Sequence, residues 1–199
     1  MKEKGKKKLE IRSPFLLLGE GSDENAVFKK LIELLKIDHV QVLDYGGRDN
    51  CANFLSALAV TSDPVERVLV TRDADESTEQ ALQSVQDAIA RAQFRSTVSV
   101  ESFIISGHNG IGALEDLFLI QIAHEDAPSL ECINQMFACA GIAKPLAKAR
   151  LHAWLALQKE PWKRLREQVA SKASPIALSV ETPNFDDLRA KLSAFFARM

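Results

Sequence analysis

The sequence has few of the features that mark membrane, secreted or zinc-binding proteins. No apolar run approaches the roughly 20 residues that a membrane-spanning helix needs. Its three cysteines, Cys51, Cys132 and Cys139, form no Cys-x-x-Cys pair, and no neighbouring residues complete four zinc ligands. We interpret them as buried structural thiols in a reducing compartment. The basic first residues are followed by no apolar signal segment, so we expect a cytoplasmic protein without membrane partners.

Nucleotide-binding motifs are also missing. The sequence contains no Gly-x-x-x-x-Gly-Lys-[Ser/Thr] loop. Gly19-Glu20-Gly21 resembles the start of a dinucleotide-binding Gly-x-Gly-x-x-Gly loop, but Glu24 stands where the third glycine belongs. Acids at Glu20, Asp23 and Glu24 would repel a pyrophosphate, which excludes this reading.

The composition is that of an ordinary globular protein, but its charges are unevenly spread. Hydrophobic residues make up 46% of the chain, as in ordinary globular proteins. A length of 199 residues is enough for one α/β domain with a helical extension. Residues 15–90 carry a balance of −8, whereas residues 141–172 carry +6 and residues 1–12 carry +4. This separation indicates a metal site beside surfaces that hold a polyanion, or basic helices that are simply solvated.

Strand and helix patterns alternate over the first 105 residues. We expect strands at residues 15–18, 40–43, 68–70 and 97–105, and helices at residues 23–35, 50–60 and 78–93. Later apolar repeats predict helices around residues 114–122, 130–137, 146–157, 162–169 and 185–196. The alternation predicts an α/β fold, a Rossmann-like parallel four-stranded sheet flanked by helices. We divide the chain into a basic segment (1–13), this α/β domain (14–125) and a mostly helical C-terminal extension packed on it (126–199).

Acidic residues follow the predicted strands. Glu20 comes after the first strand, Asp44 after the second, and Asp73 and Asp75 after the third. Ligand sites of open parallel sheets form at the carboxyl ends of the strands, so these side chains should meet at one rim. Crowded carboxylates repel one another, and a divalent cation such as Mg²⁺ removes that repulsion.

Taken singly, several of these acids have a simpler explanation. Asp23 is a plausible N-cap of the first helix, with Ala26 as its third residue, so no capping box is expected. Glu24 is then a solvated acid in the first turn, and Asp49 caps the helix after Gly47. Capping does not explain why Glu20 and the Asp73/Asp75 pair should share a rim.

Two segments resemble the motifs of the Toprim domain. Leu16 to Glu24 resembles the first motif, an apolar strand followed by Glu-Gly, and Val68 to Asp75 resembles the second, a strand followed by Asp-x-Asp. Toprim domains occur in topoisomerases, bacterial primases, recombination mediators and overcoming-lysogenization-defect (OLD) nucleases. The sequence is most similar to small stand-alone Toprim-like proteins related to OLD nucleases. Further similar segments lie at residues 44–49, 114–117 and 148–156.

The resemblance implies a Toprim-like fold and a Mg²⁺- or Mn²⁺-dependent nuclease or related phosphoryl-transfer enzyme, by family analogy in phage defence. Glu20 would be the general acid/base or a metal ligand, and Asp73 and Asp75 would hold the metal. Glu115 would add a further carboxylate. Longer relatives carry an ATPase domain that these 199 residues lack, so regulation by ATP would need an ATPase partner protein.

Some residues have two readings each. Glu115 and Asp116 begin a helix, so they are either site residues or first-turn acids that the helix dipole favours. Arg48 and Arg72 lie beside the acidic loops and either touch nucleic-acid phosphate or pair with carboxylates. Lys148, in the basic segment 141–172, is a further expected nucleic-acid contact.

The remaining alternatives concern loops and aromatics. His108 is either a proton carrier or a solvated loop histidine. Trp154 and Trp162 should pack helices together, with base stacking as the alternative. A second function of a different class stays open: a non-catalytic Toprim-like module that binds nucleic acid or a partner through the basic segment. The sequence is compatible with a homodimer and does not decide the oligomeric state.

Overall fold

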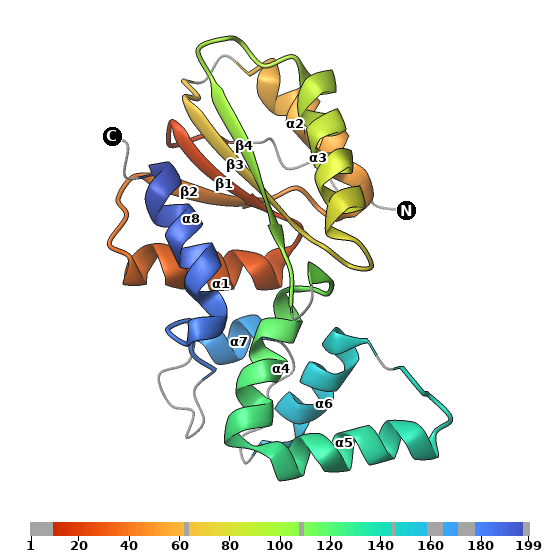
Figure 1. The fold of residues 1–199 in the computed structure, drawn as a ribbon. Helices are drawn as coiled ribbons and strands as arrows, with labels where there is room; N and C mark the ends of the chain where they lie inside the picture. The colour runs from red at the N-terminus through yellow and green to blue at the C-terminus, as the bar shows by residue number, and fades with distance from the viewer. Residues whose placement is uncertain are drawn as a thin grey trace, which may run out of the picture.

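Four parallel strands form the centre of the molecule. The structure is a computed structural model and describes residues 10–61, 64–107, 110–144, 146–158, 165–170 and 178–196. The sheet has the order β2-β1-β3-β4 (Figure 1). Its strands are β1 (Phe15–Gly19), β2 (Val40–Asp44), β3 (Arg67–Asp73) and β4 (Ser99–Ile105). This confirms the predicted α/β class and the parallel sheet.

The order of the strands creates a switch point beside β1. The chain moves from β1 to β2 on one side, then crosses to β3 on the other side of β1. Gly19 pairs with Asp44 at the end of β2, and Leu18 pairs with Val70 in β3. Because the two crossovers leave β1 in opposite directions, a crevice opens beyond the carboxyl ends of β1 and β3.

Helices cover both faces of the sheet (Figure 1). They are α1 (Ser22–Leu34), the short η1 (Arg48–Asn50), α2 (Cys51–Ala59) and α3 (Thr78–Ala92). Alternate residues of β1 divide the core between the faces: Leu16 and Leu18 pack with α2 and α3, whereas Leu17 packs with α1. Full burial of all three explains why β1 is a continuous apolar run rather than an alternating one.

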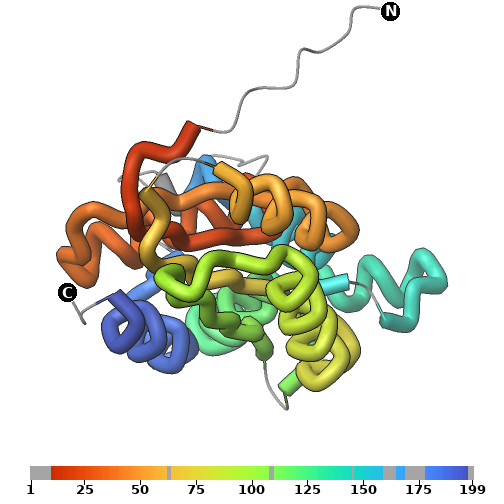
Figure 2. Tube along the Cα trace, turned by 90° about the horizontal axis from the view of Figure 1, so that it is seen from above, coloured from red at the N-terminus to blue at the C-terminus, as the bar shows by residue number. Residues whose placement is uncertain are grey.

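The second half of the chain is helical. It contains α4 (Leu114–Glu125), α5 (Ala127–Cys139), α6 (Ala147–Leu157), α7 (Leu165–Ala170), η3 (Pro183–Phe185) and α8 (Asp186–Phe196). These helices share one hydrophobic core with Leu17 and α1. Arg67 Nη1 donates to the carbonyl of Phe195 at 2.8 Å, which fastens α8 to β3. Figure 2 shows α8 and α5 at opposite sides of the molecule.

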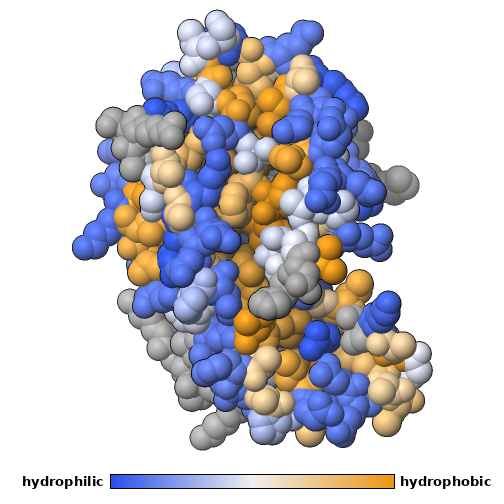
Figure 3. Space-filling model, in the orientation of Figure 1, coloured by the Kyte–Doolittle hydropathy of each residue, from blue (hydrophilic) through white to orange (hydrophobic). Residues whose placement is uncertain are grey.

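Several exposed apolar side chains lie on the α5–α6 part. They are Met136, Ile142, Leu146 and Leu157. Figure 3 shows apolar colouring on this lower part of the molecule and also along the middle of the upper part, between hydrophilic flanks. Within the described ranges, no helix is long and apolar enough to cross a membrane.

Some sequence-based expectations are corrected. α1 begins at Ser22 with Gly21 as its N-cap, so Asp23 is not the cap. Cys51 is buried as expected, but Cys132 and Cys139 are exposed on α5, so the reading as buried thiols is wrong for these two. Trp154 is fully buried and packs α6 into the core, which confirms its structural reading. His108, Trp162 and most of the basic N-terminal segment lie outside the described residues.

Candidate active site

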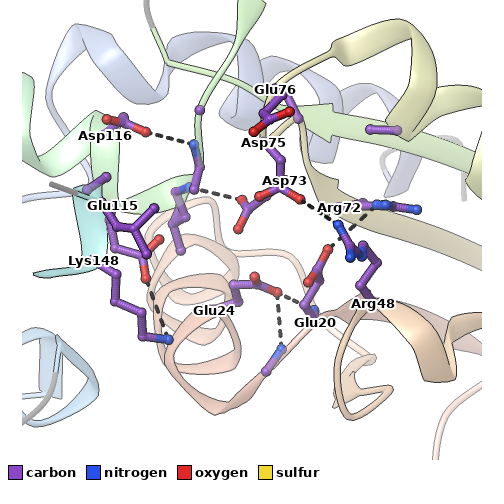
Figure 4. A pocket seen from close by; sticks show the side chains of 18 of the residues that line it. Glu20, Glu24, Arg48, Arg72, Asp73, Asp75, Glu76, Glu115, Asp116 and Lys148 are labelled. Atoms are coloured by element: carbon purple, nitrogen blue, oxygen red, sulfur yellow. Dashed lines mark hydrogen bonds and ion pairs between the residues drawn. The ribbon is translucent and has the colours of Figure 1, made fainter. Parts of the chain in front are cut away.

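A cleft of about 1040 Å³ opens at the switch point. Its walls come from the β1–α1 turn, the loop after β3, the first turn of α3, the start of α4 and the start of α6. Figure 4 shows Glu20, Glu24 and Asp73 in the middle of this site, with Glu115 and Lys148 on one side and Arg48 and Arg72 on the other. Of the carboxylates predicted to meet, Glu20, Asp73 and Asp75 do line this cleft, whereas Asp44 is exposed and lies outside it.

The tight β1–α1 turn fixes the start of this site. A Cβ atom at Gly19 would come within 2.8 Å of both Glu24 Oε2 and the Phe28 ring, so only glycine leaves room for these side chains. Glu24 folds back, and its Oε2 accepts hydrogen bonds from the backbone N–H of Glu20 and, at 3.3 Å, of Gly21. The prediction that Glu24 is a solvated first-turn acid is wrong, because the residue is buried.

Glu20 points into the cleft, and one of its two carboxylate oxygens lacks a hydrogen-bond donor. Its side chain is 20% exposed, and Arg72 Nε lies 3.8 Å from Oε1. Among the described residues, neither Glu20 Oε1 nor Arg72 Nε has a hydrogen-bond partner although both atoms are buried. Burial raises the pKa of Glu20, which Arg72 opposes and Asp75 reinforces. A buried carboxylate oxygen with no donor is rare in native proteins and marks a position that a ligand can fill.

Asp73 closes the other side of the switch point. Its Oδ1 accepts a hydrogen bond from the backbone N–H of Leu114 at 2.9 Å, which joins the end of β3 to the first turn of α4. Burial, and then the charges of Glu115, Glu20 and Asp75, raise its pKa to about 8. Without a cation, this carboxyl group therefore favours the protonated form at neutral pH.

Asp75 lies further out, on a loop with an uncommon backbone. It has a φ of 51°, in the left-handed region where aspartate is tolerated better than most residues. Two backbone hydrogen bonds with Gly112, of 2.9 and 2.7 Å, join this loop to the one after β4. The side chain is 52% exposed, and its Oδ2 lies 3.7 Å from Arg48 Nη1.

The neighbours Glu115 and Asp116 have different roles. Asp116 Oδ2 accepts from the backbone N–H of Ala113, the N-cap of α4, at 2.8 Å, so this first-turn acid stabilises the helix end rather than the cleft. The Glu115 side chain is only 12% exposed and turns into the cleft, where its Oε1 lies 3.9 Å from Lys148 Nζ. Glu115 therefore lies on the Asp73 side of the cleft, which is compatible with its expected role as a further carboxylate at the metal site.

Acids outnumber bases around the cleft, which favours a cation. The lining contains eight Asp and Glu residues against Arg48, Arg72 and Lys148. Burial, together with the charges of Asp73 and Glu20, also raises the pKa of Glu24 to about 9. Oxygen donors of this kind fit Mg²⁺, which usually takes one or two carboxylates and keeps several waters. As they stand, no three acidic, histidine or cysteine side chains among the described residues are grouped to hold one ion.

The predicted phosphate contacts line the same cleft, each beside a predicted acid. Arg72 faces Glu20, Arg48 faces Asp75 and Lys148 faces Glu115, at 3.7–3.9 Å. Arg72 is also held by a 2.6 Å hydrogen bond from Nη1 to Ser84 Oγ of α3. Both readings of these cations, carboxylate pairing and access to phosphate, are compatible with this placement.

Sequence reasoning missed Glu24 and Ser84. For Glu24 a signal existed: it is the third residue of a helix capped by Gly21, a position from which glutamate commonly bonds the N-cap backbone. The placement of the cap at Asp23 concealed it. Asp49, expected to cap α2, instead lies in η1 with a 98% exposed side chain and caps nothing.

Comparisons with known proteins identify a family. No curated protein and no solved structure matches the chain. A family model described as "Protein of unknown function (DUF3226)" matches residues 14–197, which include the whole sheet and the candidate active site. The chain therefore belongs to the DUF3226 family.

Proposed function

We propose that this protein is a Mg²⁺- or Mn²⁺-dependent phosphoryl-transfer enzyme of the Toprim type, most simply a nuclease. One observation carries the proposal: the switch point of the sheet brings Glu20 and Asp73 into one cleft, where Glu20 Oε1 is buried without a hydrogen-bond donor. Arg72 Nε, 3.8 Å away, offsets the cost of burying this group only in part, because the pKa of Glu20 is still raised, and a bound cation or a proton would compensate the rest. Burial also raises the pKa of Asp73, and a bound cation or a proton would compensate this carboxylate as well.

The residues present divide into ligands and phosphate contacts. Glu20 and Asp73 would hold the cation, with Glu115 beside Asp73 and Asp75 at the outer edge of the cleft. When bound, a divalent cation polarises a phosphodiester and stabilises the charge of the in-line transition state. Burial raises the pKa of Glu20, so this carboxyl group holds a proton more readily than a solvated one, which suits a general acid or base. Arg48 and Arg72 would orient the phosphate.

Partners follow from the resemblance to OLD-type nucleases. We propose nucleic acid as the substrate, a cytoplasmic location and an ATPase partner chain, in a role such as phage defence. The exposed apolar side chains of α5 and α6 provide surface for a partner or a second copy. Co-expression with an ATPase encoded by an adjacent gene would test the regulatory part of this proposal.

The first experiment measures metal binding and cleavage together. Mn²⁺ binding would be followed by calorimetry, and cleavage by incubation of plasmid, single-stranded DNA and RNA with Mg²⁺ or Mn²⁺. We expect Glu20→Gln and Asp73→Asn to weaken Mn²⁺ binding and to lower cleavage by about 100-fold or more. Asp44→Asn is the matched control, since Asp44 ends β2 at the same rim but is exposed and outside the cleft. Cleavage that survives both cleft substitutions would contradict the enzyme proposal.

A second candidate is a non-catalytic module that binds nucleic acid. It is favoured by the cations that already face Glu20, Asp75 and Glu115 at 3.7–3.9 Å. This function predicts salt-sensitive DNA binding without turnover, weakened by charge reversal at Lys148. Reversals at Lys163 and Arg164 belong to the same test, although both lie outside the described residues. Binding that survives all three reversals would exclude the basic segment as the contact surface.

A further inference from the structure

A second hollow of about 450 Å³ is lined by residues of η1, α2, β3 and α3. The two helices lie side by side on one face of the sheet (Figure 1). Arg48, Arg72, Gln80 and Ser84 line both the cleft and this hollow, so the two spaces adjoin. We call the hollow the arginine groove, because Arg91 joins Arg48 and Arg72 in its lining.

One face of α3 supplies most of the groove wall. Gln80, Ser84, Asp87 and Arg91 follow one another at three- or four-residue intervals, which places them in a single stripe along the helix. Gln80 and Arg91 are 11 residues apart, which is about 16 Å along the helix axis at about 1.5 Å per residue. The groove therefore leads from the acidic centre to a point well outside it.

Charge distinguishes the groove from the cleft. The cleft lining has eight acids and three bases, whereas the groove has three arginines and only Asp49 and Asp87. Gln83 Nε2 donates to Asp87 Oδ1 at 2.8 Å, which occupies one of these carboxylates. Arg91 is exposed and has no ion-pair partner among the described residues. Arg72 is only 8% exposed, and its Nε has no hydrogen-bond partner in the described part of the chain.

We propose that the arginine groove binds the phosphodiester backbone of a nucleic-acid strand adjacent to the phosphate held in the cleft, with Arg91 contacting a phosphate at its outer end. The inference rests on the proposed function in one respect, the identity of the polyanion. A strand that reaches a centre rich in carboxylates needs compensating cations along its path, and guanidinium groups match phosphate geometry. At about 3.4 Å per nucleotide of duplex axis, 16 Å of groove corresponds to about five nucleotides.

The test compares two arginines that are four residues apart. Arg91 lines the groove, whereas Arg95 is also exposed but lines neither space. Binding of a fluorescein-labelled 15-nucleotide strand, and of the corresponding duplex, would be measured by anisotropy over a range of salt concentrations without metal. We expect Arg91→Glu to weaken binding about tenfold or more and to reduce the salt slope by about one unit. Arg95→Glu should change affinity less than twofold, and Mn²⁺ binding should be unchanged in both variants.

The outcomes separate this inference from the proposed function. Equal effects of Arg91→Glu and Arg95→Glu, or no effect of either, would overturn the groove as a binding site even if the protein cleaves nucleic acid. Selective loss in Arg91→Glu supports the groove even if Mn²⁺ binding and cleavage are absent and the enzyme proposal fails. If neither single strand nor duplex binds the native chain, the groove is not a nucleic-acid site, while metal binding and cleavage still decide the proposed function. Far-UV circular dichroism of each variant excludes misfolding as the cause.

Discussion

The buried carboxyl group of Asp73 makes the stability of the metal-free protein depend on pH. Burial, followed by the charge of Glu115, raises its pKa from 3.8 to about 8. Between these values the folded protein keeps the proton and the unfolded chain loses it. The stabilisation is therefore complete below about pH 4 and is lost as the pH rises through about 8.

We accordingly expect the melting temperature without metal to fall by several degrees between pH 5 and pH 8.5. Asp73→Asn should make this fall shallower, leaving the slope that Glu24 contributes between its ordinary pKa of 4.5 and its raised pKa of about 9. Added Mg²⁺ should stabilise the native protein more at pH 8.5 than at pH 5, because the ionised carboxylate is the ligand. Differential scanning calorimetry in matched buffers would measure this. A native profile as flat as that of Asp73→Asn would contradict the assignment of the buried proton to Asp73.

At the same scale, the meeting of Glu20 and Asp73 could be predicted from the strand pattern, whereas Glu115 was expected there only through the family resemblance, and the roles of the individual acids could not be predicted. The apolar runs indicate which loops follow β1 and β3. Because these strands are parallel, their carboxyl ends and the loops that follow lie at one edge of the sheet. The roles of adjacent acids depend on side-chain direction, which spacing alone leaves undetermined at a helix start. Asp116 bonds its own helix end, while Glu115, one residue earlier, turns into the cleft.

At the scale of elements, the β1–α1 turn works only because glycine ends the strand. Gly19→Ala would place a Cβ atom 2.8 Å from Glu24 Oε2 and from Phe28 Cε2, within a fully packed corner. We expect a loss of about 1–3 kcal/mol in the free energy of unfolding, as is typical of overpacked cores. Because Glu24 holds the backbone of Glu20, Mn²⁺ binding should weaken as well. Urea denaturation and calorimetry would measure the two effects.

Gly21 is the matched control for this substitution. It has an extended backbone with φ −153°, and a Cβ atom there would meet nothing within 4 Å. Gly21→Ala should therefore change the unfolding free energy by less than about 1 kcal/mol, which includes the small preference for glycine over alanine at an N-cap. If both alanine variants lose stability equally, the close approach of Glu24 to Gly19 is not what constrains this turn.

Element boundaries were largely predictable, whereas contacts between distant elements were not. The 3.6-residue repeat of α3 and the apolar run of β1 are local signals, and both elements lie within a residue or two of their expected ends. The stripe of α3 that faces Arg72, from Gln80 to Arg91, is polar and looks like any solvated helix face in the sequence. Its significance depends on α2 lying beside it, which no local pattern encodes.

At the scale of the whole molecule, the C-terminal helices and the sheet form one packed unit. Leu17 of β1, Leu151 of α6 and Leu192 of α8 belong to the same buried cluster. Lys191 also pairs with Glu101 of β4 at 2.5 Å, so α8 is tied to the far edge of the sheet. Residues 178–196 therefore lie far from the candidate active site in sequence but contribute to the core on which its strands rest.

This shared core predicts cooperative unfolding, which a substitution in the last helix can test. Leu192 is fully buried, so Leu192→Ala should lower the free energy of unfolding by about 2–5 kcal/mol. Ala194→Ser, at an exposed position of the same helix, should change it by about 0.5 kcal/mol or less. Tryptophan fluorescence, which reports on α6 through Trp154, and far-UV circular dichroism should shift together in urea. If α8 instead detached as a separate unit, Leu192→Ala would shift part of the circular dichroism signal and leave the fluorescence transition where it was.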